Sequence, residues 1–204
     1  MVLLALLLGG LPLAVAGLLL PIEADPAARR TRPGIPARIG VRATALIAAC
    51  GVSAMVAFAA LHILVWNPTA KLPGMQLAEI YAAMAARGEP PGLAVGWVVA
   101  WAAGWAPLVA VFAAVAVLGP RGLLRNLDAR RVARLVVLAV VGIGFGHWAA
   151  GFSMGMSLAD AFGTSGSDAA PGGMVLIAAA LFAFAIAVFK FGVPMLLPRP
   201  GEAR

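Results

Sequence analysis

The sequence predicts an all-α, polytopic membrane protein that forms one integral-membrane domain over residues 1–204, and three observations predict it. First, 63% of the residues are hydrophobic and only 11% are charged, unlike a soluble globular chain. Second, apolar stretches long enough to cross a bilayer recur along the chain, without the alternating pattern of a barrel. Third, the arginines gather in short loops between these stretches, as in inner-membrane proteins.

The first apolar stretch allows two interpretations. It resembles the apolar part of a secretory signal and carries a cleavage-like Ala14-Val15-Ala16. However, no positive segment precedes it, whereas Arg29 and Arg30 follow it, so we favour a retained span with its N-terminus outside. Five spans are therefore predicted, or four if residues 1–20 are removed. They cover about residues 2–20, 41–66, 93–118, 132–153 and 173–197.

Prolines and glycines predict where the chain leaves the membrane. Residues 21–42 are too rich in proline for a regular helix, and Asn67-Pro68 is predicted to end the second span. Residues 75–87 follow as an external amphipathic helix, because Leu77, Ile80 and Met84 recur at helical spacing. The simpler interpretation is a helix that caps the bundle or lies on the membrane, and the alternative is a lid or docking helix.

The distribution of basic residues predicts the orientation. The loops assigned to the inside, with Lys190 and the tail, carry 13 Lys and Arg, whereas the external segments carry only Lys71 and Arg87. We therefore expect a multi-pass protein of the bacterial inner (cell) membrane, with its N-terminus outside and its C-terminus in the cytoplasm. The net charge of +7 indicates contact with anionic lipid headgroups, not with nucleic acid.

The third and fourth spans have features that favour close helix packing. Trp97, Trp101 and Trp105 recur every four residues, and Pro107 predicts a kink. The tryptophans are expected to pack against small residues of a neighbouring helix, or alternatively to line a cofactor or lipid site. Gly142 and Gly146 form a small-xxx-small pair of the kind that lets helices approach closely.

Sequence motifs of catalysis are missing. No phosphate-binding loop, zinc-protease motif or nucleophile elbow occurs, and the single cysteine, Cys50, excludes an internal disulfide. No carboxylate lies deep in a predicted span, although Glu79 and Asp160 border the external side and could face a shared pocket. The sequence therefore favours a protein that is not an enzyme.

The two histidines offer a possible cofactor site. Counting from Arg42 and Arg134, His62 lies about 30 Å and His147 about 20 Å above the cytoplasmic arginines. Both therefore fall in the external half of the bundle, near Trp101. His62, His147 and Trp101 are the candidate cofactor-binding residues, and haem or copper are the candidate cofactors. Met154 and Met156, in the turn after the fourth span, are candidate metal ligands.

Three functions remain open on the sequence alone. The leading one is a non-catalytic subunit, or an assembly or stabilising factor, of a membrane complex, with other membrane subunits as partners. The first alternative is a membrane redox subunit that binds haem or copper through His62 and His147. The second is a small-solute permease, for which Thr44, Ser53 and Ser153 offer a thin polar path.

Overall fold

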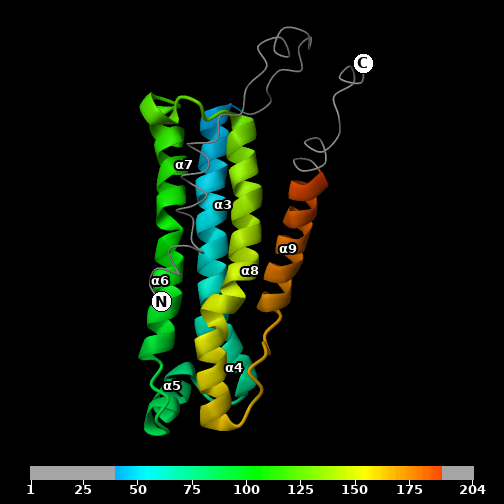
Figure 1. Ribbon diagram of the computed structural model, residues 1–204. Helices are drawn as coiled ribbons and strands as arrows, with labels where there is room; N and C mark the ends of the chain where they lie inside the picture. Colours follow the sequence, from blue (N-terminus) through cyan, green and yellow to red (C-terminus); the bar gives the residue numbers. More distant parts are fainter. Residues whose placement is uncertain (1–39, 190–204) are drawn as a thin grey trace, which may run out of the picture.

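The computed structural model describes residues 40–189, which form helices joined by short loops and contain no strand (Figure 1). The predicted span over 2–20, most of the loop after it, and Lys190 with the tail lie outside the described residues. The helical elements are α3 (Val41–Leu61), the π-helical turn η1 (His62–Trp66), α4 (Asn67–Lys71), α5 (Leu77–Ala86), α6 (Gly92–Gly104), α7 (Ala106–Leu118), the 3-10 turn η2 (Gly122–Leu124), α8 (Ala129–Phe162) and α9 (Gly172–Ala187).

Three helical stretches in the described range are long and apolar enough to cross a membrane. They are Val41–Lys71, Gly92–Leu118 and Ala129–Phe162, and they contain the predicted spans over 41–66, 93–118 and 132–153. α9 is a shorter apolar helix that begins where the predicted fifth span begins. The described part of the chain is thus all-helical, with three helices suited to a membrane.

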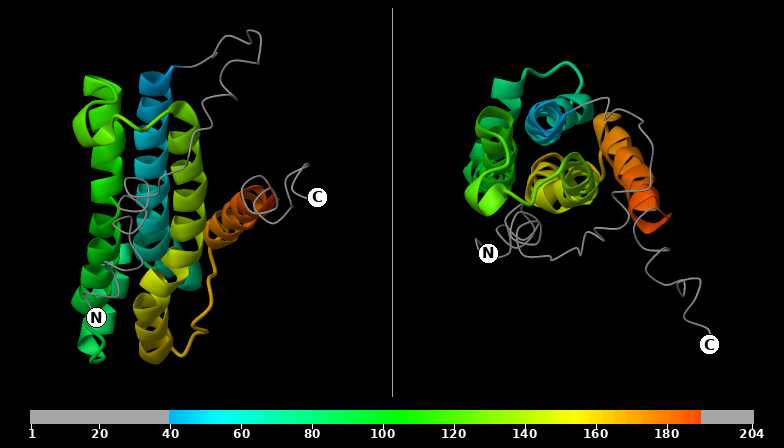
Figure 2. Two further views of the ribbon diagram at one scale, coloured as in Figure 1. Left: turned by 45° about the horizontal axis from the view of Figure 1, so that its top comes forward. Right: turned by 90° about the horizontal axis from the view of Figure 1, so that it is seen from above.

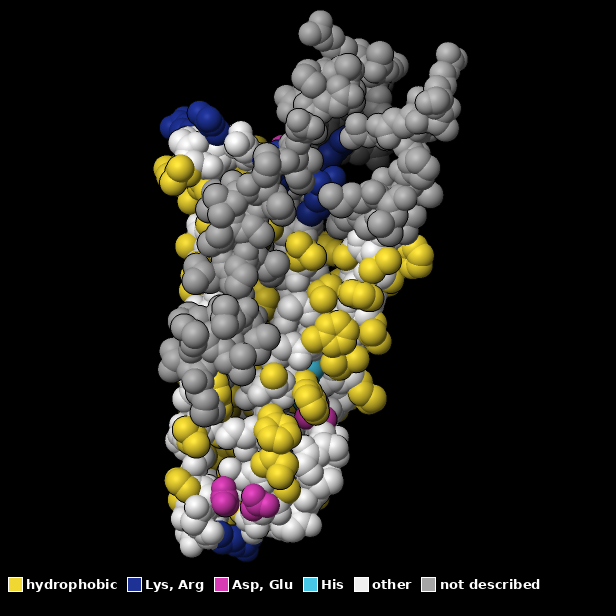
Figure 3. Space-filling view, viewed as in Figure 1, with side chains coloured by type: hydrophobic (Ala, Val, Ile, Leu, Met, Phe, Trp, Pro, Cys, Tyr) yellow, Lys and Arg dark blue, Asp and Glu magenta, His cyan; other side chains and the backbone are white. Residues whose placement is uncertain are grey.

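The long helices run side by side, with α3 packed against both α7 and α8, while α9 contacts α8 and leans outward (Figures 1 and 2). One end of the bundle, here called the arginine end, comprises residues 40–42 and 118–131. The opposite end, called the loop end, comprises residues 62–92 and 147–173. Hydrophobic side chains cover the flank between the two ends (Figure 3). Polar contacts are therefore expected mainly at the ends.

The tryptophans of the third span pack against glycines of α8. A Cβ atom at Gly142 would lie 2.7 Å from the ring of Trp105, and one at Gly146 would lie 3.1 Å from Nε1 of Trp101. Both indoles are almost fully buried. The predicted small-residue pair thus provides the space that the tryptophans fill.

The third span is interrupted at Trp105, which separates α6 from α7. The interruption lies two residues before Pro107, which has no N–H to donate to the carbonyl of Ala103. The helix is therefore interrupted next to the proline at which the sequence predicts a kink.

The sequence predicts that the second span ends at Asn67-Pro68, and this prediction is wrong, because the helix continues through α4. The helix widens to a π-helical turn just before the proline, where the N–H of Asn67 bonds to the carbonyl of His62, five residues back. Pro68 cannot donate to the carbonyl of Leu64, and the Tyr81 hydroxyl of α5 donates to that oxygen instead, at 2.6 Å. A side chain from another helix thus replaces the missing backbone bond.

The sequence also predicts that the chain leaves the helix near residue 153, and this prediction is wrong. α8 continues to residue 162 and ends at Gly163, whose φ of 66° lies in the left-handed region that favours glycine. Met154 and Met156 are therefore helical, not part of an external turn. Gly155 is a packing point, because a Cβ there would lie 2.8 Å from the carbonyl oxygen of Gly166.

The predicted external helix over 75–87 is found as α5, and it caps the end of α8. Ile80 and Met84, on its predicted apolar face, are fully buried. Arg87 follows the helix and donates from Nη1 to the carbonyl of Ala161 at 2.6 Å, while its guanidinium lies 4.5 Å from the centroid of the Phe162 ring. A cation placed on the last carbonyls of a helix satisfies unpaired acceptors and opposes the helix dipole.

Candidate metal centre

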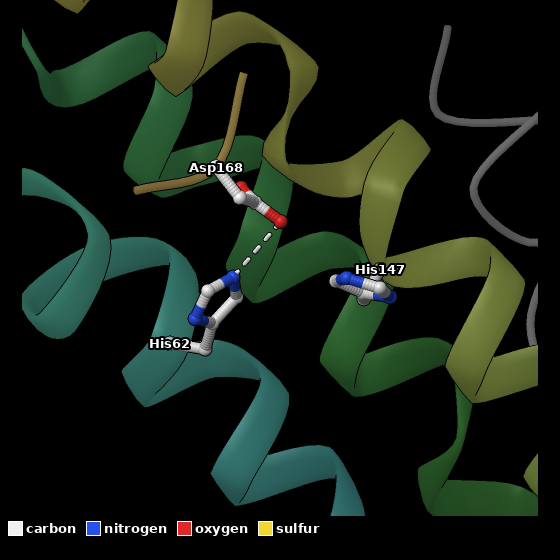
Figure 4. A group of neighbouring side chains, drawn as sticks. All are labelled: His62, His147 and Asp168. Atoms are coloured by element: carbon white, nitrogen blue, oxygen red, sulfur yellow. Dashed lines mark ion pairs between the residues drawn. The ribbon is translucent and has the colours of Figure 1, made fainter. Parts of the chain in front are cut away.

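Two histidines and one aspartate meet at the loop end of the bundle (Figure 4). His62 is the first residue of the π-helical turn, His147 lies in α8, and Asp168 lies in the loop between α8 and α9. π-helical turns occur frequently at functional sites, where the extra residue redirects a side chain. Three segments far apart in the sequence therefore converge on one point.

The three side chains lie within reach of a common ligand. The centroids of the two imidazole rings are 5.9 Å apart, and the rings are inclined at 64°. Nε2 of His62 lies 3.2 Å from Oδ2 of Asp168. One candidate ligand atom from each residue falls within 4.8 Å of the other two. Both histidines are buried, whereas the side chain of Asp168 is 37% exposed.

The hydrogen bonding of His147 prepares one ring nitrogen for a ligand. Nδ1 lies 2.5 Å from the carbonyl oxygen of Gly144, one turn earlier in α8, and can only donate to it. A neutral ring with its proton on Nδ1 leaves an unprotonated lone pair on Nε2. Among residues 40–189, this Nε2 has no hydrogen-bond partner. Metal-binding histidines usually make this same second bond to a carbonyl, which fixes their orientation.

His62 is enclosed by the beginning of α9. A Cβ atom at Gly172 would lie 2.8 Å from Nδ1 of His62, and one at Gly173 would lie 3.0 Å from Nε2. A Cβ at Gly173 would also overlap the carboxylate of Asp168. The Gly172-Gly173 pair therefore leaves the space in which the imidazole and the carboxylate meet.

Two side chains of α4 hold the loop that carries Asp168. Oδ1 of Asn67 accepts a hydrogen bond from the backbone N–H of Ala169 at 2.7 Å, and Asn67 is almost fully buried. The ammonium group of Lys71 donates to the carbonyl of Ser165. The residues directly after the π-helical turn thus position the aspartate opposite the histidine that begins this turn.

A pocket of about 270 Å³ opens beside His147 and Asp168. His147 and Asp168 belong to its lining, together with Asn67 and with side chains on the outer face of α8. The site is therefore connected to a space that a small molecule can enter.

The other candidate site residues are placed differently. Trp101 packs on Gly146 and does not line the pocket. Met154 is buried in the core and does not line it either, whereas Met156 does, with 41% of its surface exposed. The structure thus places Met156 in the pocket that His147 lines, and places Trp101 and Met154 at other contacts. Whether His62 and His147 bind a cofactor stays a prediction.

The sequence-based estimate placed the two histidines about 10 Å apart in depth, which is too far, because it used arginines as reference points. His62 is 21 residues from the start of α3, and His147 is 18 residues from the start of α8. A difference of three residues corresponds to about 4.5 Å along a helix. Helix starts give a better reference level than arginines, whose long side chains reach the same surface from different depths.

Sequence reasoning missed Asp168 and considered Glu79 and Asp160 instead. Glu79 caps its own helix by accepting the N–H of Gln76 at 2.9 Å, and Asp160 is exposed on α8. One signal could have identified Asp168: it shortly precedes Gly172-Gly173, and adjacent glycines at a helix start often allow a close approach. The role of Asn67 was hidden because Asn67-Pro68 resembles a helix end.

Two imidazoles and one carboxylate form a donor set for a divalent first-row transition metal, Zn²⁺ above all. Ligand atoms about 2.1 Å from an ion lie at most about 4.2 Å apart, so the side chains would close slightly around it. Haem fits less well, because a porphyrin plane would have to pass between the rings. The Asp168 carboxylate and the backbone of Gly172 and Gly173 lie against that space.

Comparison with known proteins gives no significant match to a protein family, a curated protein or a solved structure. The class of protein therefore follows from the fold and the site alone. The fold is an all-helical bundle with helices suited to a membrane. The site is a cluster of two buried histidines and a carboxylate at one end of that bundle.

Proposed function

We propose that this chain is a multi-pass membrane protein that binds one divalent transition-metal ion, with Zn²⁺ as the best fit, between His62, His147 and Asp168. One observation carries the proposal: Nε2 of the buried His147 has no hydrogen-bond partner in the described part of the chain, yet lies in a cluster with a second imidazole and a carboxylate. A buried polar atom without a partner costs about 1–3 kcal/mol, and an ion bound there removes that cost.

The proposed ion would also serve the role expected from the sequence, that of a non-catalytic or stabilising membrane subunit. Its ligands come from η1, from α8 and from the loop before α9, so it would join three segments of the bundle. Metal binding that joins preformed helices contributes directly to folding stability. We therefore place the metal-binding function ahead of haem-based electron transfer and of solute transport.

The proposed topology has five spans in the cell membrane, with the N-terminus outside and the arginine end in the cytoplasm. The charge distribution supports it, because Arg42 bonds to the last carbonyl of α7 and so lies at the same end of the described bundle as the arginines that follow α7. Reporter fusions after Asn126 and after Ser167 test it. The first is expected to report the cytoplasm and the second the external side, and the reverse result would contradict it.

Metal binding is tested on the full-length protein in a mild detergent. After treatment with a chelator, the protein is dialysed against Zn²⁺ and the metal per chain is measured. We expect about one ion per chain, lost in the His62→Ala, His147→Ala and Asp168→Asn variants, because removing one of three ligands leaves an incomplete site. Asp160→Asn, eight residues before Asp168 and also exposed, is the matched control and should bind as the wild type does.

The same measurement separates the proposal from its main competitor, a hydrogen-bonded His–Asp pair that only holds the loop. If the pair is merely structural, Asp168→Asn lowers the unfolding temperature but the wild type retains no Zn²⁺ after dialysis. Equal Zn²⁺ binding by Asp168→Asn and Asp160→Asn would also contradict the proposal.

A further inference from the structure

The pocket beside the candidate metal centre has two chemically different walls. His147 and Asp168 form a polar wall. Trp148, Phe152 and Met156 form the other wall, and they lie on the outside of α8 with 66%, 57% and 41% of their surfaces exposed. The rings of Trp148 and Phe152 meet edge to face, with centroids 6.1 Å apart. Figure 3 shows histidine and acidic surface bordered by hydrophobic side chains on this flank of the bundle.

The apolar wall lies at a depth where lipid surrounds the helices. Helix α8 rises about 1.5 Å per residue, so Trp148, Phe152 and Met156 lie about 28, 34 and 40 Å from its first residue, Ala129. The hydrocarbon core of a bilayer is about 30 Å thick. The apolar side of the pocket therefore opens at the level between acyl chains and headgroups, in the half of the membrane nearer the loop end.

The proposed ion would keep one coordination position free for a ligand in the pocket. Three protein ligands leave one position open on a tetrahedral metal ion, for water or another ligand. Two of the three residues, His147 and Asp168, line the pocket, so the open position would face it. A molecule there could bind the ion through an oxygen while its apolar part contacts the aromatic wall.

We infer that the pocket binds a lipid-soluble molecule that has one oxygen-bearing, metal-binding head group and an apolar tail, and that this molecule enters from the membrane. The head group occupies the open position of the ion, and the tail lies against Trp148, Phe152 and Met156. The inference rests on the proposed metal-binding function. A water-soluble ligand would gain nothing from two aromatic rings placed at the depth of the acyl chains.

The test uses the full-length protein in detergent, loaded with Co²⁺, whose visible absorption changes when a ligand binds the ion. Acetohydroxamate and octanohydroxamate share a metal-binding head group and differ in their tails. Each is titrated into the wild type, Phe152→Ala and Phe145→Ala. Phe145 is the matched control, because it is also on α8 and 42% exposed but does not line the pocket.

We expect Phe152→Ala to weaken octanohydroxamate binding roughly tenfold, the scale of one lost aromatic contact, and to leave acetohydroxamate binding unchanged. Phe145→Ala should change neither. Both variants are compared in the same detergent, so the fraction of octanohydroxamate that dissolves in the micelles is the same and does not affect the comparison. The Co²⁺ content of each variant shows that its site is formed, and Met156→Ala serves as a second variant if Phe152→Ala binds no Co²⁺.

The outcomes distinguish the inference from the function on which it rests. If wild-type protein binds Co²⁺ but neither Phe152→Ala nor Met156→Ala affects octanohydroxamate more than Phe145→Ala does, the ligand inference is wrong and the metal centre stands. If the wild type binds no Co²⁺, the proposed function itself fails, and the ligand inference fails with it.

Discussion

The two ends of the bundle are built differently. At the arginine end, Arg42 donates to the carbonyl of Leu118 at 3.3 Å, and Asp128 caps its own helix by accepting the N–H of Arg131. At the loop end, Tyr81 of α5 bonds to the π-helical turn, and Arg87 after α5 bonds to the end of α8. His62 of η1 and the α4 residues Asn67 and Lys71 contact the loop before α9. The loop end is thus held by specific contacts between distant segments, many of which converge on the candidate site.

The difference shows which features of a membrane chain determine its topology and which form a binding site. Charges at the arginine end act through their number and position, and one arginine can replace another. Contacts at the loop end act through geometry, because Lys71, Tyr81, Arg87 and Asn67 each bond to one particular backbone group of another segment. Substitutions at the loop end should therefore have large and specific effects, and comparable substitutions at the arginine end small ones.

The largest effect is expected from Gly173→Ala. The added Cβ would overlap the Asp168 carboxylate and lie 3.0 Å from Nε2 of His62, so the two ligands could not keep their positions. We expect Zn²⁺ affinity to fall at least about 100-fold, the upper range for displaced ligands. Equilibrium dialysis measures it. Gly96→Ala in α6, where a Cβ has open space, should bind normally. Normal Zn²⁺ binding by Gly173→Ala would refute the proposed ligand set.

A smaller effect is expected from Asn67→Ala. This change removes the acceptor of the Ala169 N–H and frees the loop that carries Asp168, while all three ligands remain. Zn²⁺ affinity should fall roughly 10- to 100-fold, as for other residues that position a ligand. Asn126→Ala, at an exposed position of the arginine end, is the control and should change nothing. Equal affinities of the two variants would show that the loop needs no such anchor.

Tyr81→Phe should affect stability more than binding. Pro68 has no N–H to donate to the Leu64 carbonyl, and the change removes the hydroxyl that donates to it instead. The unpaired carbonyl costs about 1–3 kcal/mol of unfolding free energy. Thermal unfolding followed by circular dichroism measures it. A decrease that matches an exposed substitution such as Asn126→Ala would show that the hydroxyl does not support the π-helical turn.

The pH dependence of Tyr81 provides a separate check. Burial raises the pKa of the Tyr81 hydroxyl above its ordinary value, so its contribution to stability is complete at neutral pH and is lost as the pH rises through the raised pKa. Tyr81 is the only tyrosine in the chain, so phenolate absorbance reports on it alone. The midpoint should be higher in the folded than in the unfolded protein, and equal midpoints would contradict the burial.

The smallest effect is expected from Arg130→Ala. Arg130 is exposed at the arginine end, and other arginines nearby keep the positive charge of that end. Stability should change by less than about 0.5 kcal/mol, and Zn²⁺ affinity should not change. A loss of Zn²⁺ binding on this substitution would mean that the two ends are coupled, and would contradict the small effect expected at the arginine end.

Sequence periodicity predicted the elements better than their ends. Hydropathy located the three long helices, because each must present an apolar surface along its whole length. The helix ends at Asn67-Pro68 and near residue 153 were wrong for a common reason. Pro68 is tolerated because Tyr81 satisfies Leu64, and Gly155 is tolerated because Gly166 packs on it. Such compensation comes from residues far away in the sequence.

Only part of the candidate site could be predicted from the sequence. Counting residues along two helices brought His62 and His147 into one half of the bundle, since helical rise is regular. Asp168 could not be placed by counting, because it lies in a loop whose path depends on Asn67 and Lys71. Met154 was misplaced because it was assigned to a turn, whereas α8 directs it into the core.

The most direct test of the central claim is X-ray absorption at the zinc edge of the Zn²⁺-loaded, full-length protein. We expect a shell of nitrogen and oxygen ligands at about 2.0–2.2 Å, with the outer-shell scattering of two imidazoles. In His147→Ala, any Zn²⁺ that is still bound should show one imidazole. A wild-type spectrum without imidazole scattering, or one identical to that of His147→Ala, would contradict a metal ion shared by His62, His147 and Asp168.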